Sequence, residues 1–161
     1  MRKCFVFDFD DTLATTTARI RVIDKSGLVT HIRPRELSNF KLKANEYFDF
    51  SEFRNSDMIK DAKPTFLLEL AKEVDEEGHD IYILTAREDD SADAIREFLM
   101  SYDIRPRMIH CVGGSQKNIP EKKRQMLMMF IEQYDKVYYY DDCSRNIDRA
   151  PDASNIRKYK V

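Results

Sequence analysis

Five short apolar runs alternate with segments of helical spacing, and this alternation constrains the fold more than any other feature of the chain. The apolar runs occupy residues 4–9, 80–84, 107–111, 136–140 and 155–159. Apolar residues with helical spacing occupy residues 65–77, 91–102 and 120–134. Strands that alternate with helices form a parallel sheet with the helices packed on it. We therefore expect an α/β fold, a three-layer Rossmann-like arrangement around a five-stranded parallel sheet.

Size and composition are typical of a single-domain globular protein. The 161 residues suit one domain, residues 1–161, and 42% of them are hydrophobic and 35% charged. No apolar run approaches the ~20 residues of a membrane span, and only a strand-length apolar run follows the basic N-terminus. We expect a cytoplasmic protein with no membrane partner, and the sequence carries no signal for an oligomeric state. The three cysteines share no metal-ligand spacing, which favours reduced thiols.

The interval 14–63 interrupts the alternation between the first strand and the first long helix. An interval of this length usually carries structure of its own. Residues 18–23 and 28–32 alternate polar and apolar side chains around a turn, which predicts a β-hairpin, and residues 36–61 leave room for a helical segment. Between residues 14 and 44 the chain has seven lysine and arginine residues and two acidic ones. We expect the hairpin to be basic.

A cluster of carboxylates follows the first apolar run, in the segment Asp8-Phe9-Asp10-Asp11-Thr12. Asp8 and Asp10 lie two residues apart just beyond a strand, so their carboxylates can converge on one site. At ~4 Å, two such charges repel by roughly 4 kcal/mol at an effective dielectric constant of ~20, and a divalent cation relieves this repulsion. The segment predicts a site for Mg²⁺ and phosphate, with a solvated acidic turn as the alternative interpretation.

Polar residues at three later points of the chain favour the first interpretation. They are Thr85-Ala86-Arg87 after the second run, Lys122 and Lys123 at the start of the helical segment 120–134, and Asp141-Asp142 after the fourth run. Ligands of open parallel sheets bind beyond the carboxyl ends of the strands. Asp8, Thr85 and Asp141 should therefore meet at one edge of the sheet.

The order of these motifs resembles that of the haloacid dehalogenase superfamily of phosphohydrolases, and the motifs span residues 5–146. Response-regulator receiver domains use the same residue types, but there the lysine follows the later strands, whereas here it precedes the last acidic pair. The resemblance implies that the first strand lies between the strands that carry Thr85 and Asp141. It also implies a small flap or cap inserted after the first strand, here within residues 14–63.

The resemblance implies a role for each residue of the first two motifs. Asp8 would attack phosphorus and form an aspartyl-phosphate, and it would also bind Mg²⁺. Asp10 would protonate the leaving group and then activate water, while its backbone carbonyl binds the metal. Thr12 would hold the turn and Asp10 in place. Thr85 would donate its hydroxyl to a phosphoryl oxygen.

The later motifs supply the cation and the remaining metal ligands in this interpretation. Lys122 and Lys123 both share a helical face with apolar residues. We favour Lys122 as the catalytic lysine that neutralises charge on the phosphate, and Lys123 is the alternative for this position. Asp141 would bind Mg²⁺ directly, and Asp142 would support it. Asn146 stands where many members of the superfamily have another acid.

Arg87 bears on the choice of substrate. The segment Thr85-Ala86-Arg87 resembles the phosphatase half of bacteriophage polynucleotide kinase-phosphatase, in which case Arg87 would bind a phosphate oxygen of the substrate. The alternative is a salt bridge to one of the acids that follow it, Glu88, Asp89 or Asp90. No phosphate-binding loop of a kinase occurs in the sequence.

Three functions agree with these observations. The first is a Mg²⁺-dependent phosphomonoesterase acting on a phosphorylated substrate, with nucleotides or the 3′-phosphate ends of polynucleotides favoured by the basic hairpin. The second is a phosphatase for small metabolites or proteins. The third is a non-catalytic protein that binds a phosphorylated ligand or a partner on the same fold, and retention of every polar motif residue weighs against it.

Overall fold

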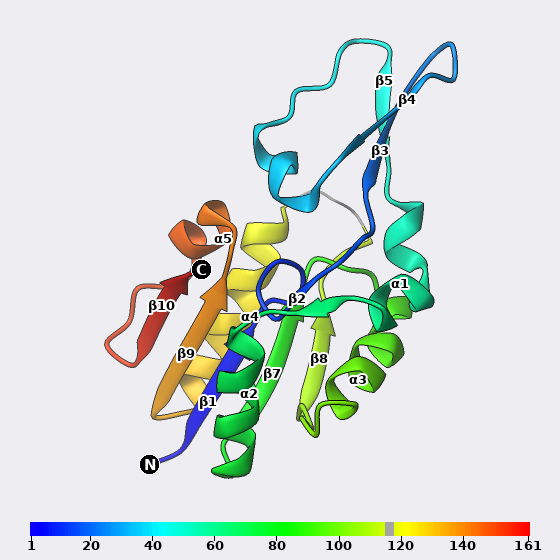
Figure 1. Cartoon of the computed structure of the whole chain (residues 1–161). Helices are drawn as coiled ribbons and strands as arrows, with labels where there is room; N and C mark the ends of the chain where they lie inside the picture. Colours follow the sequence, from blue (N-terminus) through cyan, green and yellow to red (C-terminus); the bar gives the residue numbers. More distant parts are fainter. Residues whose placement is uncertain (115–117) are drawn as a thin grey trace.

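A five-stranded parallel sheet forms the centre of the computed structural model, which describes residues 1–114 and 118–161 (Figure 1). The strand order is β10-β9-β1-β7-β8. The strands are β1 (Lys3–Phe7), β7 (Asp80–Thr85), β8 (Met108–Cys111), β9 (Lys136–Asp141) and β10 (Ile156–Lys160). The α/β fold predicted from the alternation is confirmed, and β1 lies at the centre of the sheet.

Helices cover both faces of this sheet (Figure 1). They are α2 (Leu67–Glu76), α3 (Ala92–Met100), α4 (Ile119–Gln133) and α5 (Ser144–Arg149). Alternate residues of a strand point to opposite faces. Phe5 and Phe7 of β1 accordingly pack in the core beneath α2 and α3, whereas Cys4 and Val6 pack in the core beneath α4. Burial of a strand on both faces explains its nearly continuous apolar sequence.

The polar and apolar spacing did not predict α5. It spans only six residues, and Asn146 is its one buried residue, so it has no apolar stripe that periodicity could detect. The apolar run at residues 4–9 also extends past the end of β1. The chain leaves the sheet after Phe7 because the carbonyl of Phe9 accepts hydrogen bonds from three following backbone amides.

The interval between β1 and α2 forms a flap over the carboxyl edge of the sheet (Figure 1). Its antiparallel sheet has the order β4-β3-β5, built from β3 (Ile20–Asp24), β4 (Val29–Ile32) and β5 (Glu46–Asp49). The short helix η1 (Pro34–Asn39) lies between β4 and β5, and the helices η2 (Ser51–Arg54) and α1 (Ser56–Lys60) follow β5. The strand β5 lies inside the segment for which only helical structure was expected, because its four residues acquire their conformation by pairing with β3.

A short antiparallel pair closes the base of the flap. Strand β2 (Ala14–Thr15) pairs with β6 (Lys63–Pro64), so the two ends of the inserted segment lie side by side. The remaining helix, η3 (Asp89–Ser91), precedes α3. Within the described residues, no helix is both long and apolar enough to cross a membrane.

Candidate active site

The carboxyl ends of three neighbouring strands carry the acidic and hydroxyl residues that the sequence singled out. Asp8 follows β1, Thr85 ends β7 and Asp141 ends β9. A cleft with a volume of about 1050 Å³ separates this edge from the flap. Its lining includes Asp8, Asp10, Arg87, Lys123 and Asp142 from the sheet side and Ile20, Leu37, Phe48, Phe50 and Phe53 from the flap.

The loop after β1 places Asp8 and Asp10 at the bottom of the cleft. The carbonyl of Phe9 accepts hydrogen bonds from the amides of Thr12, Leu13 and Ala14, which closes a tight turn. Asp11 adopts a φ of 58°, in the left-handed region where aspartate is tolerated better than most residues. The loop therefore reverses the chain immediately beyond the strand and leads it into the flap.

Thr12 holds this turn through its backbone. Its amide donates to Phe9, and its carbonyl accepts from the hydroxyl of Thr65 at 2.5 Å. Its own hydroxyl is buried and has no hydrogen-bond partner within the described part of the chain. The structure thus gives the Thr12 hydroxyl no hydrogen bond to Asp10, although the resemblance implied that Thr12 holds that residue in place.

Lys123 is the cation that joins the two buried acids. Its ammonium nitrogen lies 3.1 Å from Asp8 Oδ1 and 2.7 Å from Asp141 Oδ2, and its side chain is 1% exposed. Burial acts to lower the pKa of Lys123, but the charges of Asp141 and Asp8 outweigh it and raise that pKa, so the lysine stays protonated. Burial is also the main reason why the pKa of Asp8 is raised, and Lys123 opposes this shift.

This geometry favours Lys123, the alternative left open by the sequence, over Lys122 as the lysine beside Asp8. Lys122 donates to the carbonyl of Val112 and does not take the position between the two acids. Both lysines have apolar residues four positions later, so spacing alone could not separate them. Helix α4 packs on the sheet through Leu127 and Phe130, and Lys123 shares that buried face.

Asp141 has its oxygens occupied by protein groups. Its Oδ2 accepts hydrogen bonds from Lys123 at 2.7 Å, from the Tyr139 hydroxyl at 2.5 Å and from Asn146 at 3.0 Å. Its Oδ1 accepts from the Cys143 amide at 2.8 Å and again from Asn146 at 3.1 Å. These four donor groups fill the roughly four lone-pair positions of a carboxylate.

Asp142 is the member of the acidic pair that faces the cleft. It lines the cleft together with Asp8, whereas Asp141 does not. One carboxylate oxygen from each of these three residues lies within 4.8 Å of the others. Burial and the nearby Asp141 raise the pKa of Asp142 to about 6. Asp142 therefore has the more accessible carboxylate, whereas the Asp141 carboxylate binds Lys123 and the following turn. The role of each in metal binding stays a prediction.

The residues at this point fit a hard divalent cation. Four carboxylates, Asp8, Asp10, Asp141 and Asp142, surround two cations, Lys123 and Arg87. A hard divalent metal ion prefers carboxylate and carbonyl oxygens as ligands. Asp8 and Asp142 offer carboxylate oxygens to the cleft, so they are the side chains that would hold it, with Asp141 as their buried support.

Arg87 does not pair with any of the acids that directly follow it in the sequence, and its role toward a substrate phosphate stays a prediction. Its guanidinium donates to both oxygens of Asp10, at 2.8 Å each, and to the carbonyl of Phe53 at 2.6 Å. Glu88, which the sequence offered as a partner, instead pairs with Arg54 of the flap. Arg87 therefore orients Asp10 and ties the sheet edge to the flap, because a bidentate pair fixes both position and angle.

Thr85 ends β7 beside this pair, and the loop that follows it allows very little additional volume. Its hydroxyl oxygen accepts from the Arg87 amide at 3.2 Å, which leaves the hydroxyl proton for another acceptor. Gly113 packs against the same loop: a Cβ there would lie 2.4 Å from the carbonyl oxygen of Ala86. The sequence analysis missed Gly113 and Tyr139, since a single glycine and a strand tyrosine give no pattern that indicates a site.

The aromatic residues of the flap form its own small core and also face the cleft. Phe48, Phe50 and Phe53 pack in series with ring centroids 5.8 to 6.5 Å apart. They join Ile20 and Val22 in a cluster distinct from the two cores of the sheet. The flap thus has an apolar surface opposite the carboxylates.

Comparison with solved structures identifies the fold. The whole chain matches 42% of a chain in a structure of the Pnkp1/Rnl/Hen1 RNA repair complex, with a TM-score of 0.65 and 14% identity. It also matches 83% of a haloacid dehalogenase-like hydrolase from Streptococcus pneumoniae over 98% of its own length, with a TM-score of 0.55 and 13% identity. The chain has a haloacid dehalogenase-like fold. No protein-family model and no curated protein sequence matches it significantly.

The haloacid dehalogenase-like fold agrees with the strand order that the resemblance implied. Strand β1, which carries Asp8, lies between β7, which carries Thr85, and β9, which carries Asp141. The chain spans less than half the length of the repair-complex chain that it matches. The likeness therefore concerns one part of that protein.

Proposed function

We propose that this protein is a Mg²⁺-dependent phosphomonoesterase that works through an aspartyl-phosphate. The observation that carries the proposal is the buried ammonium group of Lys123, in contact with Asp8 and Asp141 at the edge of the cleft. A nucleophilic carboxylate can attack a phosphoryl group only when the charge on that group is neutralised. Lys123 and a divalent cation held by Asp8 and Asp142 would supply this neutralisation.

The reaction would proceed in two displacements. A carboxylate oxygen of Asp8 attacks phosphorus, the bond from phosphorus to the ester oxygen breaks, and the leaving alkoxide takes a proton from Asp10. Water then attacks the same phosphorus and gives a proton to Asp10, which restores the Asp8 carboxylate and releases inorganic phosphate. Arg87 holds Asp10 in position for both proton transfers.

The substrate we propose is a nucleotide or the 3′-phosphate end of a polynucleotide. The flap supports this choice with its excess of arginine and lysine and with the apolar surface that Phe48, Phe50 and Phe53 present to the cleft. Aromatic side chains bind bases of any sequence by stacking. The likeness to a chain of an RNA repair complex supports the same class of substrate.

Release of inorganic phosphate from a 3′-phosphorylated oligonucleotide tests the proposal. We expect release with Mg²⁺, none with EDTA, and a loss of at least about a thousandfold in Asp8→Asn, because removal of a nucleophile has effects of this size or larger. Asp152→Asn serves as the matched control, since the Asp152 side chain is 93% exposed. Turnover of phosphorylated metabolites or phosphopeptides alone would contradict the substrate class, and turnover that persists in Asp8→Asn would contradict the mechanism.

A further inference from the structure

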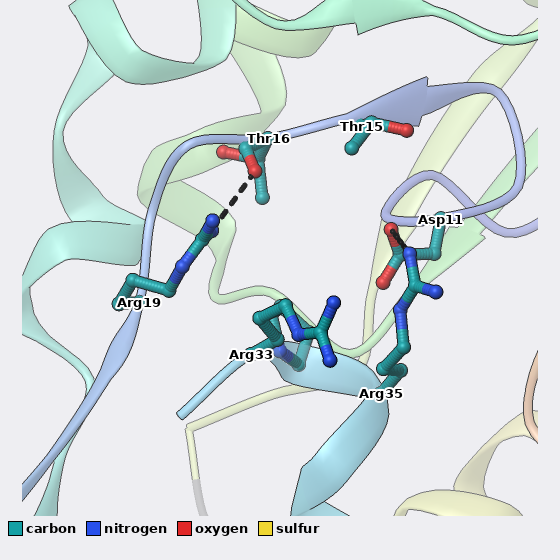
Figure 2. A pocket seen from close by; sticks show the side chains of 7 residues that line it. Asp11, Thr15, Thr16, Arg19, Arg33 and Arg35 are labelled. Atoms are coloured by element: carbon teal, nitrogen blue, oxygen red, sulfur yellow. Dashed lines mark hydrogen bonds and ion pairs between the residues drawn. The ribbon is translucent and has the colours of Figure 1, made fainter. Parts of the chain in front are cut away.

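A second, smaller pocket adjoins the cleft on the flap side. Its lining consists of Asp11, Thr15, Thr16, Arg19, Arg33, Pro34 and Arg35. Figure 2 shows the guanidinium groups of the three arginines around one space, below the threonines and beside Asp11. Four of these residues, Asp11, Thr15, Pro34 and Arg35, also line the cleft, so the two spaces share a wall.

The pocket carries more positive than negative charge. The one acidic residue in its lining is Asp11, whose carboxylate lies 3.6 Å from Arg35. Glu36 pairs with Arg33 at 3.3 Å from outside the lining, and both of these side chains are about half exposed. Exposed pairs of this kind contribute little free energy, so an anion with higher charge can compete for the arginine.

Arg19 is the arginine best placed to receive such an anion. Its guanidinium donates only to backbone carbonyls among the contacts described, those of Thr16, Thr17 and Ala18, at 3.1 to 3.3 Å. Across residues 1–114 and 118–161, no carboxylate forms an ion pair with it. Guanidinium groups bind phosphate oxygens in preference to neutral carbonyls because the hydrogen bonds are charge-assisted.

The size of the pocket restricts the ligand. Its volume of about 30 Å³ suits two or so water-sized groups, since one water needs roughly 10–15 Å³ on this measure. A base or a sugar does not fit in this space. The two non-bridging oxygens of a phosphate that enters from the cleft do.

We propose that the pocket formed by Arg19, Arg33 and Arg35 binds a second phosphate of the substrate, the one on the 5′ side of the terminal nucleoside. This inference rests on the proposed function, because it assumes that the 3′-phosphate lies at Asp8. In a polynucleotide that second group is the phosphodiester that joins the last nucleotide to the chain. The flap then selects substrates with two adjacent phosphates over simple monoesters.

Three substrates test this selection: a nucleoside 3′-monophosphate, the nucleoside 3′,5′-bisphosphate and a 3′-phosphorylated oligonucleotide ending in the same nucleoside. We expect kcat/KM for the bisphosphate and the oligonucleotide to exceed that for the monophosphate by about tenfold or more, the usual effect of a charged hydrogen bond. In Arg33→Gln and in Arg19→Gln this ratio should fall toward one. Lys25→Gln, which removes the same charge from the exposed hairpin turn, should keep the ratio of the wild type.

The substrates separate the possible sources of the second phosphate. A gain for both the bisphosphate and the oligonucleotide supports the pocket as a phosphate site, and a further gain for the oligonucleotide assigns it to polynucleotide ends. Equal values for all three substrates in the wild type would overturn the inference. An equal fall of the ratio in Lys25→Gln would also overturn it, because general attraction by the flap would then explain the preference.

Binding measurements keep the inference testable if no turnover occurs, a result that would count against the proposed function alone. Asp8→Asn protein and an oligonucleotide provide the assay, with the dissociation constant measured across a range of salt concentrations. Each phosphate contact on a single strand contributes about −0.7 to the slope of log K against log salt. In the Asp8→Asn background, Arg33→Gln should weaken binding about tenfold and make this slope shallower, whereas Lys25→Gln should do neither. Identical behaviour of the two double variants would contradict the inference.

Discussion

The sheet edge and the flap use charged side chains in opposite ways. At the edge, Lys123, Asp141 and Arg87 are buried, and each contacts at least two groups that fix its position. In the flap, Arg33 and Arg35 are more than half exposed and each pairs with one carboxylate. A buried charge without partners is very costly, so the edge has one arrangement, whereas exposed arginines can exchange partners at little cost. The edge is therefore suited to a fixed chemical step and the flap to recognition.

The largest test of this contrast is the replacement of the two neighbouring lysines of α4. Lys123→Met should lower the free energy of unfolding by about 3–5 kcal/mol, because it leaves Asp8 and Asp141 buried without their cation. Lys122→Met, the matched control, should cost far less. Urea denaturation in EDTA measures both values. Equal losses would show that Lys123 contributes no more than Lys122 to the free energy of unfolding.

The next largest effect concerns the donor that the sequence did not reveal. Tyr139→Phe removes the hydroxyl that donates to Asp141, and we expect a loss of about 1.5–3 kcal/mol, the range for a hydrogen bond to a charged group. Tyr138→Phe on the opposite face of β9 is the control. Thermal unfolding compares the two, and a smaller loss for Tyr139→Phe than for Tyr138→Phe would contradict the buried network.

A substitution in the flap should have a smaller and more local effect. Val22 is buried between the flap strands, and Val22→Ala removes two methyl groups, worth roughly 1.5 kcal/mol at ~0.8 kcal/mol for each carbon. We expect faster amide hydrogen exchange in β3, β4 and β5 and unchanged exchange in β1 and β9. Equal acceleration in both sheets would mean that flap and core unfold as one unit.

The smallest effect is a pH dependence at the sheet edge. The pKa of Asp142 rises from the ordinary 3.8 to about 6, so the folded state holds this proton over a range where the unfolded state has lost it. The contribution of Asp142 to the stability of the metal-free protein therefore falls as the pH rises from about 4 to about 6. Asp142→Asn lacks this loss, so it should gain stability relative to the wild type between pH 4.5 and 7.

Denaturation in EDTA at several pH values measures this difference, and a difference that is independent of pH would contradict the raised pKa. Mg²⁺ should reverse the trend. The ionised carboxylate is the form that binds a metal, so the stabilisation of the wild type by Mg²⁺ should grow as the pH rises through 6. Asp142→Asn should show little of that growth.

The sheet could be predicted because its signals are local. Runs of apolar residues in β1, β7 and β9 mark strands buried on both faces, and the acids directly after them are placed by the strands themselves. The flap could be predicted only in part. The alternation that marks β3 and β4 is visible in the sequence, whereas β5 is too short to be recognised without the partner strand that it pairs with.

The sequence by itself determined the fold class, the order along the chain of the strands that end in polar residues, and the set of residues that could meet at Asp8. The tertiary structure decided which side chain takes each position: Lys123 rather than Lys122, Asp142 rather than Asp141 toward the cleft, and Asp10 as the partner of Arg87. The physical reason is that the two kinds of interaction act over different separations along the chain. Hydrophobic periodicity is set within a few residues, whereas the pairing of buried charges depends on groups 18 to 115 residues apart that only packing brings into contact.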